Sequence, residues 1–192
     1  MQDRIAQILR SSARVHDETA ATLCQEIAQA AQLIIDSMRD GGKLALCGNG
    51  GSAADAQHIA GELVGRFQQE RRPLPAIALT TDTSVLTSIS NDYGYCDVFR
   101  KQVEALLAPG DVLIALTTSG NSANCLEAVK AAREKDVTTI AMTGAGGGEV
   151  ARQVDLALIV PHEQTARIQE IHITIGHALC ELVEEALCGG KQ

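Results

Sequence analysis

The first forty residues carry apolar side chains at helical spacing. Between Thr19 and Met38 such side chains recur every three or four positions, and Gly41 and Gly42 then end the pattern. The recurring positions are Leu23, Ile27, Ala30, Leu33, Ile34 and Met38. This pattern predicts a helix over residues 19–38 and an N-terminal helical extension over residues 1–40.

Further along the chain, short apolar runs alternate with helical patterns. Runs that are apolar at almost every position are typical of parallel strands buried on both faces. The five runs are KLALC at 43–47, AIALT at 76–80, VLIALT at 112–117, TTIAM at 138–142 and LALIV at 156–160. We therefore predict an α/β fold, a doubly wound five-stranded parallel sheet preceded by N-terminal helices. Its ligands are expected beyond the carboxyl ends of the strands.

No linker, low-complexity tract or sustained repeat divides the sequence, which predicts a single domain over residues 1–192. Two predicted strands run directly into loops that a helix follows. The first loop is GNGGS at 48–52, and the second is TTSGNS at 117–122.

The first loop fits the dinucleotide fingerprint G-x-G-x-x-G/A with Gly48, Gly50 and Ala53. That site needs an acidic residue about 20 positions later, at the end of the second strand, to bind the ribose. Here the second strand ends near Asp82, too far along, and the loop lacks the G-K-[ST] of a P-loop. Both nucleotide sites are therefore disfavoured.

Both loops suit a phosphate group. Glycine lets the backbone approach an anion, and a helix N-terminus offers free N–H groups. The second loop adds four hydroxyl groups, from Thr117, Thr118, Ser119 and Ser122. Two structural alternatives stay open: Ser52 with Asp55 is a capping pattern for the first helix, and the second loop resembles an ordinary capped turn.

His58 and Glu62 follow the first loop at helical positions i and i+4, so their side chains share one face about 6 Å apart. From spacing alone, a surface ion pair is the simpler interpretation. A metal ligand pair or a catalytic acid–base pair is the functional one.

Composition narrows the partners. The net charge is −8 and only 2% of residues are aromatic, so there is neither a basic surface for a phosphate backbone nor a stacking surface for bases. We therefore do not expect the protein to bind nucleic acid. The sequence shows no apolar stretch of about 20 residues and no signal-peptide core, so we expect a cytoplasmic protein without a membrane partner.

Four segments together resemble the sugar isomerase (SIS) domain family, and within it the members that isomerise a heptose phosphate. They are CGNGGSAADAQHIAGEL, TTDTSVLTSISNDYGY, TTSGNSAN and RIQEIHITIGH. The resemblance covers nearly the whole chain and implies the flavodoxin-like sandwich of that family. It also implies interconversion of sedoheptulose 7-phosphate and D-glycero-D-manno-heptose 7-phosphate, on the route to lipopolysaccharide, by a homotetramer.

The family's functional positions are all present. The resemblance implies that substrate contacts come from Asn49, Gly50, Gly51, Ser52, Glu62, Asn91, Asp92 and Gln169, and phosphate contacts from Thr117, Thr118, Ser119 and Ser122. Family members usually have serine where this chain has Thr117, a change that keeps the hydroxyl and adds a methyl group. A non-catalytic regulator with the same fold, or an isomerase of another sugar phosphate, is the alternative.

The resemblance further implies metal ligands at His58, Glu62, Gln169 and His177, with Glu62 as catalytic base and His177 as acid. Two imidazoles, a carboxylate and an amide oxygen suit one divalent ion, with zinc expected first. Spacing alone does not choose among Gln169, Glu170 and His172, and only the family pattern favours Gln169.

Overall fold

The computed structural model describes residues 1–144 and 146–189, and residues 145 and 190–192 of the predicted domain lie outside this part. Five parallel strands form one sheet in the order β2-β1-β3-β4-β5. Their bounds are β1 Leu44–Gly48, β2 Ala76–Ala78, β3 Val112–Thr117, β4 Thr138–Thr143 and β5 Leu156–Ile159. The doubly wound parallel sheet predicted from the apolar runs is confirmed.

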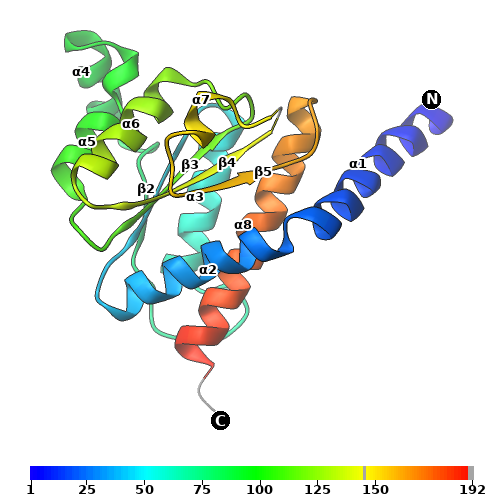
Figure 1. The fold of residues 1–192 in the computed structure, drawn as a ribbon, viewed down its shortest axis with the longest axis horizontal. Helices are drawn as coiled ribbons and strands as arrows, with labels where there is room; N and C mark the ends of the chain where they lie inside the picture. The colour runs from blue at the N-terminus through cyan, green and yellow to red at the C-terminus, as the bar shows by residue number, and fades with distance from the viewer. Residues whose placement is uncertain (145, 190–192) are drawn as a thin grey trace.

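Helices cover both faces of the sheet (Figure 1). They are α1 Gln2–Thr22, α2 Cys24–Arg39, α3 Gly51–Val64, α4 Thr83–Asp92, α5 Arg100–Leu106, α6 Ala123–Glu134, α7 Gly148–Ala151 and α8 Thr165–Cys188, with a 3₁₀ turn η1 at Tyr95–Asp97. Alternate residues of one strand point to opposite faces. Leu44 and Leu46 therefore pack with α2, α3 and α8, whereas Ala45 and Cys47 pack with α5 and α6. Burial on both faces explains the continuous apolar runs.

The strand order places the two conspicuous loops side by side. β2 is added on one side of β1 and β3 on the other, so the order in which successive strands are added to the sheet reverses at β1. Gly48 at the end of β1 lies opposite Leu116, and Thr117 at the end of β3 lies opposite Thr143. Loops that leave such adjacent strand ends form the usual ligand crevice of this architecture.

The predicted helix over 19–38 is wrong at its start, because Leu23 interrupts the helix and separates α1 from α2. Leu23 has φ −119° and ψ 2°, outside the helical region, and its side chain is buried. Leu23 and its neighbours are neither glycine nor proline, so tertiary packing rather than local sequence sets this break. Only Val15 and Thr19 of α1 are buried, and α1 reaches away from the rest of the molecule (Figure 1).

Over residues 1–144 and 146–189, no helix combines the length and apolar character that crossing a membrane requires. A cytoplasmic location stays a prediction of the sequence.

His172 connects α8 to the end of β4. Its ring is completely buried, and Nε2 lies 3.2 Å from the carbonyl oxygen of Thr143. Burial lowers the pKa of His172 to about 4, and the bond to Thr143 offsets only part of that effect. The ring is therefore neutral in the folded protein at pH 7, while in the unfolded chain it titrates near pH 6.5.

We predict that His172 makes the fold acid-sensitive. Between pH 6.5 and about 4 the unfolded chain binds a proton at this position that the folded chain does not. The free energy of unfolding therefore decreases as the pH is lowered through this range, by about 3 kcal/mol in all. Urea unfolding of the parent and of His172→Gln at pH 7.0, 5.5 and 4.5 measures the effect. His162→Gln is the control, and equal pH slopes for parent and His172→Gln would contradict the assignment.

Candidate active site

The first loop begins where β1 ends, and Gly50 shapes it. Gly50 has φ 56°, a left-handed conformation that glycine adopts without strain, and it precedes the first residue of α3. Its carbonyl oxygen accepts hydrogen bonds from the N–H groups of Ala53 and Ala54, at 3.1 and 3.2 Å. Backbone geometry at Gly50 thus starts α3 close to the strand ends.

The capping of α3 by Ser52 with Asp55, an alternative that the sequence left open, does not occur. Gly50 occupies the N-cap position, and Ser52 lies inside the helix with its side chain buried against Gly48. Asp55 is buried too, and its Oδ2 has no hydrogen-bond partner among the described residues. Burial raises the pKa of Asp55, and the nearby His58 offsets part of that increase. The conformational freedom of Gly50 replaces the side-chain cap that the sequence pattern suggested.

The second loop gathers its hydroxyls at the start of α6. Thr117 Oγ1 lies 2.9 Å from Ser122 Oγ, and Ser119 Oγ accepts the N–H of Asn121 at 3.2 Å. A hydroxyl that accepts a hydrogen bond still has its own hydrogen to donate. Ser119 is exposed and Thr118 is half-buried, so this loop offers hydroxyl groups and a helix N-terminus to an anion.

The segment after β4 holds the second loop in place. The Gly144 N–H donates to the Thr118 carbonyl at 3.2 Å, and the Val150 N–H donates to the Gly120 carbonyl at 2.9 Å. The side chain of Asn121 accepts the N–H of Glu149 at 3.1 Å. Backbone bonds therefore fix the loop before any ligand binds.

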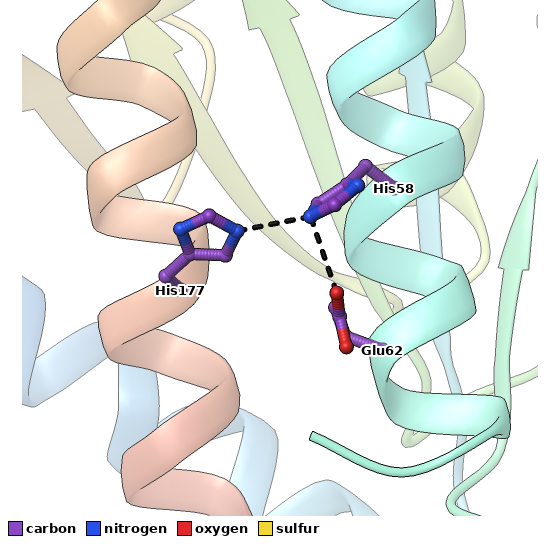
Figure 2. A group of neighbouring side chains, drawn as sticks. All are labelled: His58, Glu62 and His177. Carbon is purple, nitrogen blue, oxygen red and sulfur yellow. Dashed lines mark hydrogen bonds and ion pairs between the residues drawn. The ribbon is translucent and has the colours of Figure 1, made fainter. Parts of the chain in front are cut away.

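Two helices bring His58, Glu62 and His177 together. α3 and α8 lie side by side, and Figure 2 shows His58 and Glu62 pointing from α3 toward His177 on α8. His58 Nε2 lies 2.9 Å from His177 Nε2 and 3.2 Å from Glu62 Oε1. Positions 119 residues apart in the chain thus form one cluster at the surface of the helix pair.

The cluster has the donor atoms of a metal site. Nε2 of His58 carries at most one proton, so it can serve only one of its two close neighbours with a hydrogen bond. The other contact would then bring lone pairs together. A divalent cation among the three groups would use all the lone pairs, because imidazole nitrogen and carboxylate oxygen are ordinary zinc ligands at about 2.0–2.2 Å. The three side chains fit such an ion.

The structure separates the three residues of α8 that spacing left open. Gln169 lies against Gly51 at the start of α3. Glu170 accepts the hydroxyl of Ser12 at 2.7 Å and pairs with Arg167, so it faces α1, whereas His172 points into the core. Only Gln169 of the three faces α3, on the side of the glycine loop. Its role as a metal or substrate ligand stays a prediction.

Asn91 and Asp92 end α4 and are exposed, and the Asn91 amide donates to the Asp92 carboxylate at 2.8 Å. Three residues further on, the Tyr95 hydroxyl donates to Asn49 Oδ1 at 3.0 Å. This contact ties the segment after α4 to the first loop. The substrate contacts expected of Asn91 and Asp92 stay predictions.

Sequence reasoning missed the support behind His177. The ring of Phe67, which follows α3, stacks on the His177 ring with centroids 5.7 Å apart and planes inclined by 24°. Phe67 is one of two phenylalanines in the chain. The scarcity of phenylalanine was the only sequence feature that pointed to Phe67, because its partner His177 lies 110 residues away in the sequence.

A buried ion pair fixes the segment that carries Phe67. The Glu184 carboxylate accepts the backbone N–H groups of residues 67–69 at 2.7–2.9 Å and the Arg71 guanidinium at 2.8 Å. Burial alone raises the pKa of Glu184, but these four donors together lower it below its ordinary value. Arg71 also donates to the carbonyl oxygens of Glu62 and Leu63, at 2.9 and 2.7 Å, at the end of α3. Glu184 and Arg71 thus attach the end of α3 to α8 below the cluster.

Comparison with known proteins gives a consistent result. A model of the SIS domain matches residues 7–144. The chain is 56% identical over 188 residues to the phosphoheptose isomerase of Aquifex aeolicus, covering 98% of both chains. The structure of a phosphoheptose isomerase from Neisseria gonorrhoeae is similar with a TM-score of 0.92 at 50% identity, over 96% of this chain and 98% of that one. One from Francisella tularensis has a TM-score of 0.93 at 42% identity, with the same coverage.

We predict that the cluster binds one zinc ion per chain. Titration calorimetry of the chelated protein with zinc should give a single site, and zinc at about 100 times its Kd should raise the free energy of unfolding by roughly 2.7 kcal/mol. His58→Ala should abolish that stabilisation, because it removes the nitrogen shared by both contacts. His16→Ala, on α1, is the control. Zinc affinity unchanged in His58→Ala would exclude this site.

Proposed function

The chain belongs to the SIS domain family, and on that premise we propose that it is an aldose–ketose isomerase acting on sedoheptulose 7-phosphate. Its relatives at 56% and 50% identity over nearly the full length are phosphoheptose isomerases, which supports this substrate. The product is D-glycero-D-manno-heptose 7-phosphate, a precursor of lipopolysaccharide heptose. The intact set of His58, Glu62 and His177 favours an enzyme over a non-catalytic regulator, because partner binding needs no convergent acid and base.

One observation carries the proposal: the distance between the loops and the cluster. α3 begins at Gly51 beside the strand ends, and His58 lies seven residues later, about 10 Å further along the helix axis. In this proposal the phosphate lies at the second loop, beside the strand ends, and the reacting carbon lies further along α3, beside the cluster. An open-chain heptose phosphate has a comparable length, whereas a triose phosphate is too short to reach both ends.

The chemistry needs a proton moved between neighbouring carbons. In our proposal the Glu62 carboxylate takes the C1 proton of the ketose while His177 gives a proton to the O2 oxygen, which forms an enediol. His177, now without its proton, then takes the O1 proton, and Glu62 returns its proton to C2, which yields the aldose and restores both groups. Positioned acid and base groups each contribute about 10²- to 10⁴-fold to such steps.

A divalent ion held by His58, Glu62 and His177, with Gln169 as the proposed fourth ligand, would polarise the sugar carbonyl as a Lewis acid. Phe67 and the Glu184–Arg71 pair keep the groups from α3 and α8 in register around it.

We predict that Glu62→Gln slows the proton transfer by orders of magnitude and leaves substrate binding intact. The amide still offers an oxygen atom, but it cannot accept a proton at neutral pH, so isomerisation should fall by about 10²- to 10⁴-fold. Binding of sedoheptulose 7-phosphate, measured by calorimetry, should stay within severalfold of the parent. Glu70→Gln, at an exposed ion pair just beyond α3, is the matched control.

Proton NMR in deuterated water tests the same assignment directly. His177→Gln should still exchange the C1 proton of the ketose for deuterium, slowly and without net aldose, because Glu62 remains. Glu62→Gln should not exchange it. Exchange at the parental rate in Glu62→Gln would remove Glu62 as the base.

We also propose a homotetramer in which residues 1–40 contribute contacts between copies. Ile5 and Leu9 of α1 are 50% and 65% exposed, and the helix projects from the body of the molecule. An isolated projecting helix with apolar side chains in water is poorly stabilised, because helical stability comes mainly from packing an apolar face.

We predict that light scattering of the parent gives the mass of four chains. The double variant Ile5→Glu with Leu9→Glu should give a smaller assembly, because it places charge on the apolar side of α1. Gln7→Glu adds one negative charge on the opposite side of α1 and should leave the assembly intact. A parent that sediments as a monomer with full activity would contradict the proposed assembly.

A further inference from the structure

The side chain of Asn49, which was expected to contact substrate, is hydrogen-bonded to a neighbouring amide side chain. Its Nδ2 donates to Asn124 Oδ1 at 2.8 Å, and Asn124 Nδ2 donates back to Asn49 Oδ1 at 2.8 Å. Asn49 Oδ1 also accepts the Tyr95 hydroxyl at 3.0 Å. An amide oxygen has two lone pairs, and both are used here. Among the residues that the structure describes, the second hydrogen of Asn49 Nδ2 meets only the distant Cys125 Sγ, at 4.0 Å.

The orientation of this amide pair is fixed by the backbone. The N–H of Cys125 can only donate, and it lies 3.0 Å from Asn124 Oδ1. That contact decides which end of the Asn124 side chain is oxygen, and the reciprocal bonds then orient Asn49. Asn124 is 3% exposed, so its polar atoms depend on these protein partners.

The pair joins the two loops of the site. Asn49 is the first residue after β1, and Asn124 lies in the first turn of α6, directly after the second loop. Tyr95 adds the segment that follows Asn91 and Asp92. The three side chains therefore connect the two loops and the segment after α4, which are the expected substrate contacts outside Glu62 on α3 and Gln169 on α8.

We propose that Asn49 and Asn124 are positioning residues that set the distance between the glycine loop and the phosphate loop. This inference rests on the proposed function, because it requires a sugar phosphate that contacts both loops at once. The side chain of Asn49 then contributes to binding through the loop geometry, and the substrate meets the backbone of the loop. A ligand that occupies only the phosphate loop does not depend on the pair.

Two ligands of different length test the proposal. Sedoheptulose 7-phosphate spans both loops, whereas inorganic phosphate contacts only residues 117–122, which keep their own bonds to Gly144, Glu149 and Val150. In Asn124→Ala we expect the KM for the sugar phosphate to rise about tenfold, in keeping with the loss of two hydrogen bonds. The inhibition constant of inorganic phosphate should change less than about twofold, within the spread of such measurements.

Asn121→Ala is the matched control, since it removes an asparagine three residues away that supports the phosphate loop itself. Its amide donates to the Ser119 carbonyl at 2.9 Å and accepts the Glu149 N–H. This variant should weaken the binding of the sugar phosphate and of inorganic phosphate together. The two asparagine variants are therefore expected to differ in the inhibition constant of inorganic phosphate, which should rise in Asn121→Ala and stay nearly unchanged in Asn124→Ala.

The reciprocal geometry gives a second readout. Either single variant, Asn49→Ala or Asn124→Ala, already breaks both bonds of the pair. The KM of the double variant should therefore lie within about threefold of the higher KM of the two single variants. Tyr95→Phe removes one bond from an exposed ring and should raise the KM severalfold without unfolding risk, again with an unchanged phosphate constant.

Equal increases of KM and of the phosphate constant in Asn124→Ala and Tyr95→Phe would overturn the proposal, as would multiplicative effects in the double variant. Parental KM values in all the variants of the pair would overturn it while leaving the proposed function standing. A parent that does not isomerise sedoheptulose 7-phosphate would overturn the proposed function and this inference with it.

Discussion

The site depends on the close approach of α3 and α8. The two helices run in parallel, since Gly51 contacts Gln169 at one end and Ile59 contacts Gly176 further along. A β-carbon on Gly176 would lie 2.5 Å from Ile59 Cδ1, and one on Gly51 would overlap the amide of Gln169. One glycine on each helix thus permits an approach that larger residues would prevent. At this distance the imidazoles of His58 and His177 meet.

The sheet supplies the second constraint, which is direction. Because β1, β3 and β4 are parallel and in register, the glycine loop, the hydroxyl loop and the segment that supports it all emerge at one edge. α3 then carries its residues away from that edge, along α8. In the proposed reaction, phosphate binding at the strand ends and proton transfer at the cluster are therefore separated along the direction of α3, and the proposed acid and base lie where the far end of an extended ligand would reach.

The sequence predicted best what depends on local pattern. Continuous apolar runs marked all five strands within two residues of their observed ends, because strands buried on both faces need apolar side chains throughout. Glycines and hydroxyls at strand ends marked both loops. The break at Leu23, the stacking of Phe67 on His177 and the burial of Asn124 were not predictable, because each depends on a partner more than 40 residues away or on packing without a local signal. The cap expected at Ser52 failed since Gly50 adopts a conformation that the pattern does not encode.

The helix packing and the proposed cation reinforce one another. Without a cation, only one of the two contacts of His58 Nε2 can be a hydrogen bond, and the other opposes the close approach of α3 and α8. The packing of α3 against α8 must therefore be stabilised elsewhere, by the apolar contact of Ile59 with Gly176 and by the buried ion pair of Glu184 with Arg71. These contacts lie outside the cluster and hold its ligands together in advance, so a bound ion meets little conformational cost. By linkage, such an ion would stabilise the α3–α8 packing that every part of the proposed reaction requires.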